Sequence, residues 1–330
     1  MARATSAARD RVWGEWRPHG HCSARNAMNA ALVAVALVPS MLVSAAIFWL
    51  CSTRSDVARK TECSFVADQP FAVLNVLFFA NVCVGFWLIG LAQKSFWLID
   101  PFWTLLPPLL AAWYLLHALW LRQGGVGQTP RIVVWLALIA LWSARLTWSY
   151  FRRERWRFGE REDWRYTSMA RRCPRAWWAA SFFAVGIAQQ PLLVGITWPY
   201  EVLVTASAPF GAIDCIAALG ALLGLVIAYA SDNELATYMA RNAARRARGE
   251  AIEPILRTGL WAFSRHPNYV GEQVWWWCVA LGGAALSGRW VLLAGAALNT
   301  LCLASVTVMT EKRMLDQWGE FILFILSESS

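Results

Sequence analysis

Long apolar runs alternate with short polar stretches along most of the chain. Each run is long enough, or nearly so, to cross the ~30 Å hydrocarbon core of a bilayer as a helix. Helices are the spanning elements that these runs support, because backbone groups in lipid must be hydrogen-bonded within the segment. We predict about eight transmembrane helices, within a range of seven to nine, at residues 27–50, 71–92, 97–120, 132–150, 177–200, 212–230, 270–287 and 290–310.

Composition supports an all-α polytopic membrane protein. The chain is 58% hydrophobic and 15% charged, and the charged fraction is well below that of soluble domains. We expect a polar, Arg-rich tail over 1–26, one transmembrane domain over 27–313 and a further tail over 314–330. The net charge of +9 would suggest nucleic acid in a soluble protein. Here the charges lie between spans, so the expected partner is the lipid bilayer and no nucleic acid is expected.

The distribution of basic residues predicts the orientation. If the N-terminus is cytosolic, segments on the cytosolic side carry 23 Lys and Arg, whereas segments on the other side carry 6. This asymmetry favours eight helices with both termini in the cytosol. The two large basic loops, 151–176 and 231–269, then share one membrane face.

Cysteines and prolines add local predictions. The eight Cys contain no C-x-x-C pair, so we expect no metal site. Cys51 and Cys63 share one loop, and a disulfide between them requires an oxidising compartment on that side. Pro39 would kink its span, and the pair at 107–108 either opens a pocket or makes a plain packing kink.

The densest run of functional side chains lies between Leu256 and Trp277. Polar groups at a membrane boundary are costly unless they are paired or hold a ligand. The run ends a hydrophilic loop and begins an apolar helix, and a helix N-terminus suits an anionic ligand. The alternative is a basic cluster that meets lipid headgroups and is followed by a belt of Trp.

The residue types in and near this run suit a phosphorylated cofactor. Guanidinium groups bind phosphates, and the candidates are Arg241, Arg257 and Arg265. The side-chain amide of Asn268 both donates and accepts hydrogen bonds, as does that of Gln273. Carboxylates that could bind ribose hydroxyls are Asp232, Glu234 and Glu272. Asp232 and Glu234 follow directly on an apolar helix, where a solvated helix end is the alternative interpretation.

Two residues of the run can supply a proton, His266 and Tyr269. For a hydrophobic substrate, we expect a pocket near Asp100, Trp103 and Arg145, because charges within or at the edge of a span are functional candidates. The chain has no G-x-G-x-x-G motif that follows a strand, so a dinucleotide would be held by the helical bundle and its cytosolic loops.

Residues 265–272, RHPNYVGE, resemble the signature of the steroid 5α-reductase C-terminal superfamily. The wider run 259–277 resembles its uncharacterised reductase-like branch of bacteria and plants, and further blocks agree at 95–107, 145–166, 230–235 and 299–313. The resemblance covers roughly 70–315, with the reductase signature at 230–313.

This resemblance implies a membrane oxidoreductase that uses NADPH to reduce a carbon–carbon double bond conjugated to a carbonyl in a steroid, sterol or enone lipid. A hydride would go to the β-carbon while a donor polarises the carbonyl. The cofactor positions that it implies are Asp232, Asn268 and Glu272. It also implies a location in the endoplasmic reticulum or another endomembrane.

The sequence departs from the family pattern at Ala262, where Arg is common, and at Glu234, where Gln is usual and a carboxylate adds negative charge near a polyphosphate. The tail 314–330 also differs from the usual Tyr-containing end. Two alternative functions follow. One is an S-adenosylmethionine-dependent membrane methyltransferase of the isoprenylcysteine type, which shares an R-H-P-x-Y element. The other is a non-catalytic sterol-binding membrane protein, which the altered tail suggests.

Overall fold

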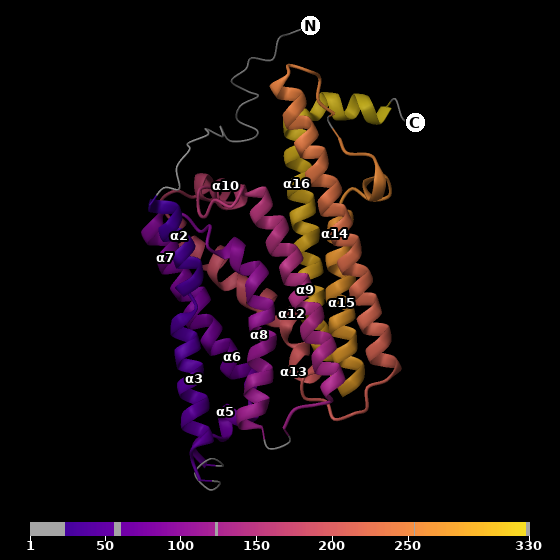
Figure 1. The fold of residues 1–330 in the computed structure, drawn as a ribbon. Helices are drawn as coiled ribbons and strands as arrows, with labels where there is room; N and C mark the ends of the chain where they lie inside the picture. Colours follow the sequence, from indigo (N-terminus) through magenta and orange to yellow (C-terminus); the bar gives the residue numbers. More distant parts are fainter. Residues whose placement is uncertain (1–23, 56–60, 123–124, 254, 328–330) are drawn as a thin grey trace.

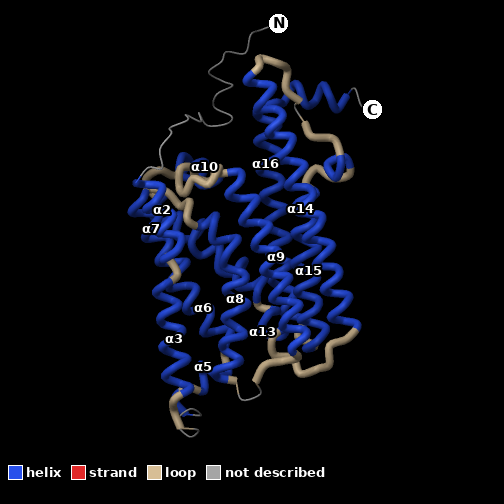
Figure 2. Tube along the Cα trace, in the orientation of Figure 1, coloured by secondary structure: helices blue, strands red, loops and turns tan. Residues whose placement is uncertain are grey.

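The computed structural model is a bundle of long, roughly parallel helices (Figure 1). It describes residues 24–55, 61–122, 125–253 and 255–327, with side chains as far as residue 316, so residues 1–23 of the predicted tail 1–26 lie outside the described residues. No strand occurs in these ranges (Figure 2). The helices are α2 Ala24–Val35, α3 Val38–Ser52, α5 Ser64–Asp68, α6 Pro70–Phe78, η1 Phe79–Phe86, α7 Trp87–Gln93, α8 Ile99–Leu121, α9 Thr129–Arg153, α10 Trp164–Arg172, α11 Trp177–Ser181, η2 Phe182–Ile187, η3 Gln190–Val194, α12 Gly195–Thr197, α13 Pro199–Leu203, α14 Ala212–Ala247, η4 Gly259–Ala262, α15 Pro267–Ser287, η5 Trp290–Leu292 and α16 Leu293–Ser327.

The predicted all-α polytopic fold is confirmed. Seven helical segments of the described chain are long and apolar enough to cross a membrane. The one predicted span outside these seven, 270–287, is α15, which packs against α13, α14 and α16. Its first turns carry Asn268, Glu272 and Gln273, so its mean hydropathy is lower than that of the other spans. The polar side chains are therefore concentrated on a helix that the other helices surround.

Proline and π-helical geometry interrupt several spans. The first span breaks between α2 and α3, directly before Pro39 in the first turn of α3, as predicted. The second and fifth spans contain π-helical turns, η1, η2 and η3. By contrast, α8 continues through Pro107 and Pro108. Such irregularities expose backbone groups that must find other partners.

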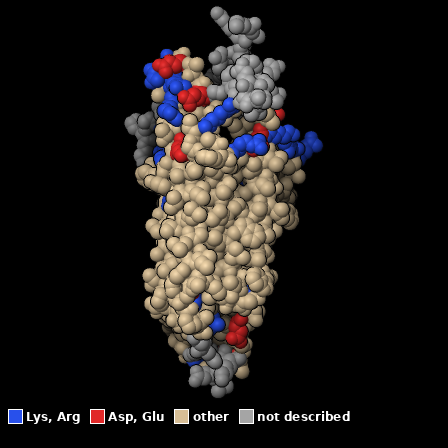
Figure 3. Space-filling model, turned by 90° about the vertical axis from the view of Figure 1, so that its right-hand side faces the viewer, with Lys and Arg blue, Asp and Glu red and all other residues tan. Residues whose placement is uncertain are grey.

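The two ends of the bundle differ in charge. We call the end with α10 and the 248–266 loop the basic face, and the end with the 204–211 loop the distal face. Charged side chains gather on the basic face, and an uncharged belt separates them from the few at the distal end (Figure 3). With 36 residues, α14 is ~54 Å long, so it extends well beyond a ~30 Å hydrocarbon core. It projects on the basic face (Figure 1).

The distal face is held by a buried ion pair between α9 and α14. The Arg131 side chain is fully buried, and its Nε and Nη2 donate to the two carboxylate oxygens of Asp214 at 2.6 and 2.9 Å. Its remaining donors bind the carbonyls of Ala206, Ala208 and Pro209 at 2.9–3.1 Å. Because every donor group has a partner, the pair fixes the loop that leads into α14. Arg131 therefore adds no free positive charge to the distal face.

The same face carries a disulfide. Cys51 and Cys63 are bonded, with a Cα–Cα distance of 5.8 Å. The sequence leaves open whether this disulfide forms, and the structure shows that it does. The bond links the end of α3 to the start of α5.

On the basic face, Asp163 caps α10. Its carboxylate accepts the backbone N–H of Arg165 at 2.8 Å and the guanidinium of the same residue at 2.7 and 2.9 Å. Burial acts to raise the pKa of the Asp163 carboxyl, but the hydrogen bonds and charge of Arg165 outweigh it, so the pKa lies below its usual value. The cap is therefore an ionised carboxylate.

Arg131→Met should destabilise the protein by about 3–5 kcal/mol, because it leaves the Asp214 carboxylate buried without its partner. Thermal unfolding in detergent measures the change. Arg122→Met, an exposed Arg at the same face, is the matched control and should leave the melting temperature unchanged. Equal melting temperatures for parent and Arg131→Met would contradict this assignment.

The cap on α10 should be sensitive to acid. Since the folded pKa of Asp163 is depressed, its stabilisation is complete above about pH 4 and is lost as pH falls through the folded pKa. Hydrogen exchange of the α10 amides, corrected for intrinsic rates, should show protection at pH 5 that decreases towards pH 2. In Asp163→Asn this dependence should disappear. The same acid loss in both proteins would show that another group is responsible.

Candidate functional site

The loop that leads into α15 is folded back against the projecting part of α14. Tyr238 Oη and Asn242 Nδ2 donate to the carbonyl of Glu253 at 2.7 and 2.8 Å, and the Glu253 N–H donates to Asn242 Oδ1 at 3.0 Å. These three bonds fix the position of Glu253 along α14. The sequence motif therefore reaches α15 from a structured loop.

Two further hydrogen bonds join the loop to α14 at residues 260 and 261, nearer to the motif. Glu234 Oε2 accepts the N–H of Leu260 at 3.0 Å, and the Trp261 indole N–H donates to the carbonyl of Ser231 at 3.1 Å. Gly259 has φ +62°, and a Cβ there would fall on the Glu234 carboxylate, so glycine is favoured at this position. Glu234 thus fixes the loop backbone, which differs from the expectation that it faces a polyphosphate.

The alternative interpretation of Asp232 and Glu234 as a solvated helix end is wrong. Instead of ending after the apolar segment, α14 continues to Ala247, and both carboxylates project from an uninterrupted helix. Asp232 lies where α14 runs beside α9 and α15. Its neighbours on those helices are the centre of the candidate site.

Arg145 of α9 joins two carboxylates from two other helices. Its Nη1 donates to Asp232 Oδ2 at 3.0 Å, and its Nη2 forms a close ion pair with Glu272 Oε1 of α15. The second oxygen of Glu272 accepts the Trp142 indole N–H at 2.9 Å. Asn268 Nδ2 lies 3.4 Å from Asp232 Oδ1. We call Arg145, Asp232, Asn268 and Glu272 the central network.

The central network is nearly shielded from solvent. The side chain of Arg145 is 6% exposed, and those of Asp232 and Glu272 are each 15% exposed. Two carboxylates and one guanidinium give a formal charge of −1. Buried charges of this kind are stable only when they are paired and hydrogen-bonded, so the surplus negative charge favours a ligand that brings hydrogen-bond donors or a cation.

Several polar atoms in and beside the network have no protein partner. The buried atoms of this kind are Arg145 Nε, Asn268 Oδ1 and Gln273 Nε2. The other amide atom of Gln273 accepts the Thr300 hydroxyl at 2.6 Å. Buried polar atoms without a partner are costly, and a bound ligand would supply what they lack.

The outer rim of the site lies where Glu311, near the middle of α16, meets the start of α15. Glu311 accepts hydrogen bonds from Arg265 Nη1 and His266 Nε2, both at 3.2 Å. The ring of His266 stacks on Tyr269, with centroids 5.2 Å apart. Because a carboxylate only accepts, the Nε2 proton of His266 is directed at Glu311. Glu311 fixes the protonated nitrogen of His266, and its place in the terminal block at 299–313 was the sequence signal for it.

The remaining predicted residues lie apart from the network. Arg241 and Arg257 are exposed on the basic face, and the side chain of Arg265 is 83% exposed. Trp103 donates its indole N–H to Gln189 Oε1 at 2.6 Å. Asp100 begins α8 beside α10, where its electrostatic neighbours include Asp163.

Sequence analysis did not assign Arg152 to the site. It donates from Nη1 to Asn233 Oδ1 at 2.8 Å and from Nη2 to the Asp232 carbonyl at 3.4 Å. It thereby ties the end of α9 to α14 directly above the central network. Its position in the basic loop resembled that of several other Arg residues, so the sequence offered no way to single it out.

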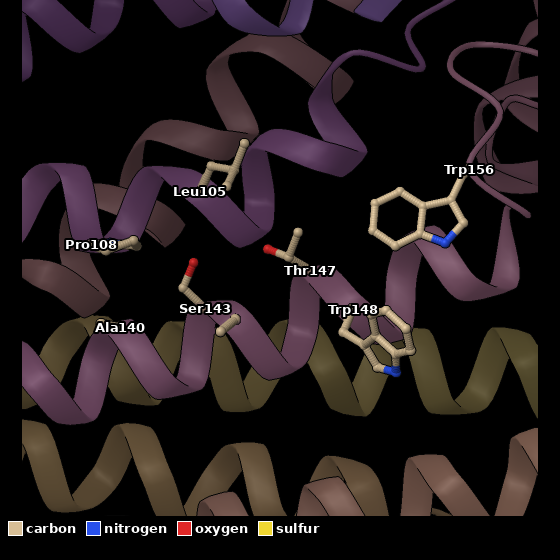
Figure 4. Close-up of a pocket in the computed structure, with 8 residues that line it drawn as sticks. Leu105, Pro108, Ala140, Ser143, Thr147, Trp148 and Trp156 are labelled. Carbon is tan, nitrogen blue, oxygen red and sulfur yellow. The ribbon is translucent and has the colours of Figure 1, made fainter.

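A pocket of about 420 Å³ lies on another side of α9 (Figure 4). It is lined by Leu105, Pro108, Ala140, Ser143, Ala144, Thr147, Trp148 and Trp156. Ser143 and Thr147 flank Arg145 at two residues' distance, and a two-residue step turns a helix by about 200°. The pocket and the central network therefore occupy opposite faces of α9. Of the two expectations for Pro107 and Pro108, the structure supports the pocket.

Comparison with known proteins identifies a family. The family described as "Protein of unknown function (DUF1295)" matches residues 86–324. The chain is also similar to "Uncharacterized protein C594.04c" of Schizosaccharomyces pombe, with 28% identity over 272 residues that cover 76% of each chain. No solved structure matches. Since the family match spans well over half of the chain, this polytopic membrane protein belongs to the DUF1295 family.

Proposed function

We propose that this protein is a membrane oxidoreductase of the steroid 5α-reductase C-terminal superfamily. It binds NADPH at the basic face and reduces a carbon–carbon double bond in a lipid-like substrate. The observation that carries the proposal is the convergence of Asp232, Asn268 and Glu272 in one buried network. These are the three positions that the sequence resemblance assigned to the cofactor, and they come from two different helices.

The chemistry of the network fits one part of NADPH. Each carboxylate oxygen of Asp232 and Glu272 already accepts one hydrogen bond but has capacity for a second, which ribose hydroxyls can donate. Asn268 Oδ1 and Gln273 Nε2, both buried without partners, offer an acceptor and a donor for an amide or a base edge. The network's negative charge disfavours phosphate there, so the phosphates belong at the exposed Arg241, Arg257 and Arg265 of the basic face.

Bound NADPH supplies a hydride, and the chain's own residues position it and manage the proton. Arg145 and Trp142 each hold one oxygen of Glu272, which fixes the carboxylate. Glu311 orients the His266 ring, and Tyr269 stacks against that ring. His266 and Tyr269 are therefore the proton-donor candidates. Asp100 and Trp103 remain our candidates for contact with the hydrophobic substrate.

A second candidate function follows from the network's charge. S-adenosylmethionine carries ribose hydroxyls and a sulfonium cation, and a formal charge of −1 suits both. The methyltransferase hypothesis therefore predicts selective binding of S-adenosylmethionine at the same residues. A non-catalytic sterol-binding protein would bind neither nucleotide.

Titration of the detergent-purified protein with NADPH, NADH and S-adenosylmethionine separates these functions. We expect NADPH to raise the melting temperature most. Asn268→Ala should raise the Kd for NADPH at least tenfold, about the effect of losing one or more hydrogen bonds that a buried polar group makes to a ligand. Asn75→Ala is the matched control, since Asn75 is hydrogen-bonded to Gln190 in other spans, and its affinity should equal the parent's. Unchanged affinity in Asn268→Ala would overturn the reductase proposal.

We also propose that the basic face is cytosolic and that the distal face meets the oxidising lumen of the endoplasmic reticulum or a related endomembrane. The Cys51–Cys63 disulfide on the distal face supports this orientation. So does the count of Lys and Arg, 23 in the segments predicted on the cytosolic side against 6 on the other.

Cys173 tests the orientation, because it is a partly exposed free thiol on the basic face between α10 and α11. A membrane-impermeant maleimide should label it in sealed microsomes whose cytosolic surface faces outward. In a Cys22→Ser background, which removes the thiol of the predicted cytosolic tail, Cys173→Ser should remove the signal. Labelling of Cys173 only after the membrane is permeabilised would reverse the orientation.

A further inference from the structure

The lining of the pocket between α8 and α9 is apolar apart from the indole N–H groups of Trp148 and Trp156 and two hydroxyl groups, those of Ser143 and Thr147. Both point from α9 towards α8 (Figure 4). Ala140, Ala144, Trp148 and Trp156 of the same lining are exposed, so the pocket faces the side of the bundle that meets lipid. Its volume of about 420 Å³ lies within the range of small-molecule sites.

The proton of Ser143 is already used. Pro108 has no N–H, so the carbonyl of Thr104, four residues earlier, lacks its helical partner. Ser143 Oγ donates to this carbonyl at 2.7 Å. A carbonyl only accepts, so the direction of the bond is fixed. Ser143 can offer the pocket only its lone pairs.

The proton of Thr147 is used in the same way. Thr104 Oγ1 donates to the carbonyl of Pro101 at 2.8 Å. Since the single proton of Thr104 is spent there, Thr147 Oγ1 must be the donor in its 2.8 Å bond to Thr104 Oγ1. Thr147, too, presents only acceptor capacity to the pocket.

We propose that this pocket binds a lipid alcohol, an apolar molecule whose one hydroxyl donates to Thr147 and Ser143. A ketone of the same shape brings only an acceptor, and it finds no free proton at either hydroxyl. The indole nitrogens of Trp148 and Trp156 lie on the sides of their rings turned away from Ser143 and Thr147 (Figure 4). Thr147 is six residues before the end of α9, about 9 Å along the helix axis. The ligand hydroxyl thus lies near the cytosolic end of the span, with Trp148 and Trp156 beside it.

This site is separate from the proposed cofactor site. It lies on the opposite face of α9 from Arg145, and none of its lining residues belongs to the central network. The proposal therefore needs no nucleotide, and its test gives the same answer whether or not the protein is a reductase.

The test uses photoreactive diazirine derivatives of cholesterol and of the matching 3-ketone, in nanodiscs of phosphatidylcholine without nucleotide. Adducts are mapped to peptides by mass spectrometry. The alcohol should label the 140–156 peptides about fivefold more than the ketone, the effect of one net hydrogen bond. Ala144→Trp, which fills the pocket, should abolish labelling by both probes.

Thr147→Val is the decisive variant. It removes the acceptor yet leaves Thr104 bonded to Pro101, so the protein should keep its melting temperature. Labelling by the alcohol probe should fall about fivefold. Ser143→Ala should lose less, because it uncovers the Thr104 carbonyl as another acceptor. Ser305→Ala, which removes an exposed hydroxyl bonded within α16, is the matched control and should behave as the parent.

Three results would overturn the proposal. They are equal labelling by alcohol and ketone, undiminished alcohol labelling in Thr147→Val, and equally efficient labelling of these peptides by a diazirine phosphatidylcholine. The last would show that the pocket takes up ordinary bilayer lipid only.

Discussion

The candidate site depends on one guanidinium placed between two carboxylates inside the bundle. Arg145 of α9 pairs with Asp232 of α14 and with Glu272 of α15. A buried charge without its partner is far more costly than a paired one, so these three helices have one acceptable relative placement. Close backbone packing supports it, because a Cβ on Gly271 would strike the backbone of Gly224 and Ala228 in α14. The same constraint leaves a surplus negative charge at the place where α15 begins, and this charge selects what can bind there.

This arrangement divides the molecule by depth and by side. The central network offers acceptors inside the bundle, whereas the exposed Arg residues of the basic face offer positive charge at its surface. Such a division suits a cofactor with a donor-rich sugar and a separate polyphosphate. The pocket on the other face of α9 offers lone pairs in an apolar setting. Helix α9 therefore has two chemically different faces. Arg145 lies on the face of the central network, and Ser143 and Thr147 lie on the face of the pocket.

The sequence predicted the spans well because hydrophobic length is a local property. A short motif and a resemblance singled out Asp232, Asn268 and Glu272, which the structure brings together. It placed Arg145 with the substrate, since which of two helix faces meets which neighbour depends on tertiary packing. The interpretation of Asp232 and Glu234 as a helix end failed because α14 keeps its hydrogen bonds well beyond the apolar segment. Glu234 was expected near phosphate, but its partner is a backbone N–H 26 residues away. The partners of Ser143 and Thr147 on α8 were likewise hidden, because they depend on how two spans pack.

The central claim is that a nucleotide binds at the Arg145–Asp232–Glu272 network. The most direct measurement is an experimental structure of the protein with NADPH bound. Our account predicts ribose hydroxyls within hydrogen-bonding distance of Asp232 or Glu272, an amide or base edge at Asn268, and phosphates among the Arg residues of the basic face. Density for NADPH at another place, with Arg145 still paired to both carboxylates and no ligand beside them, would contradict it.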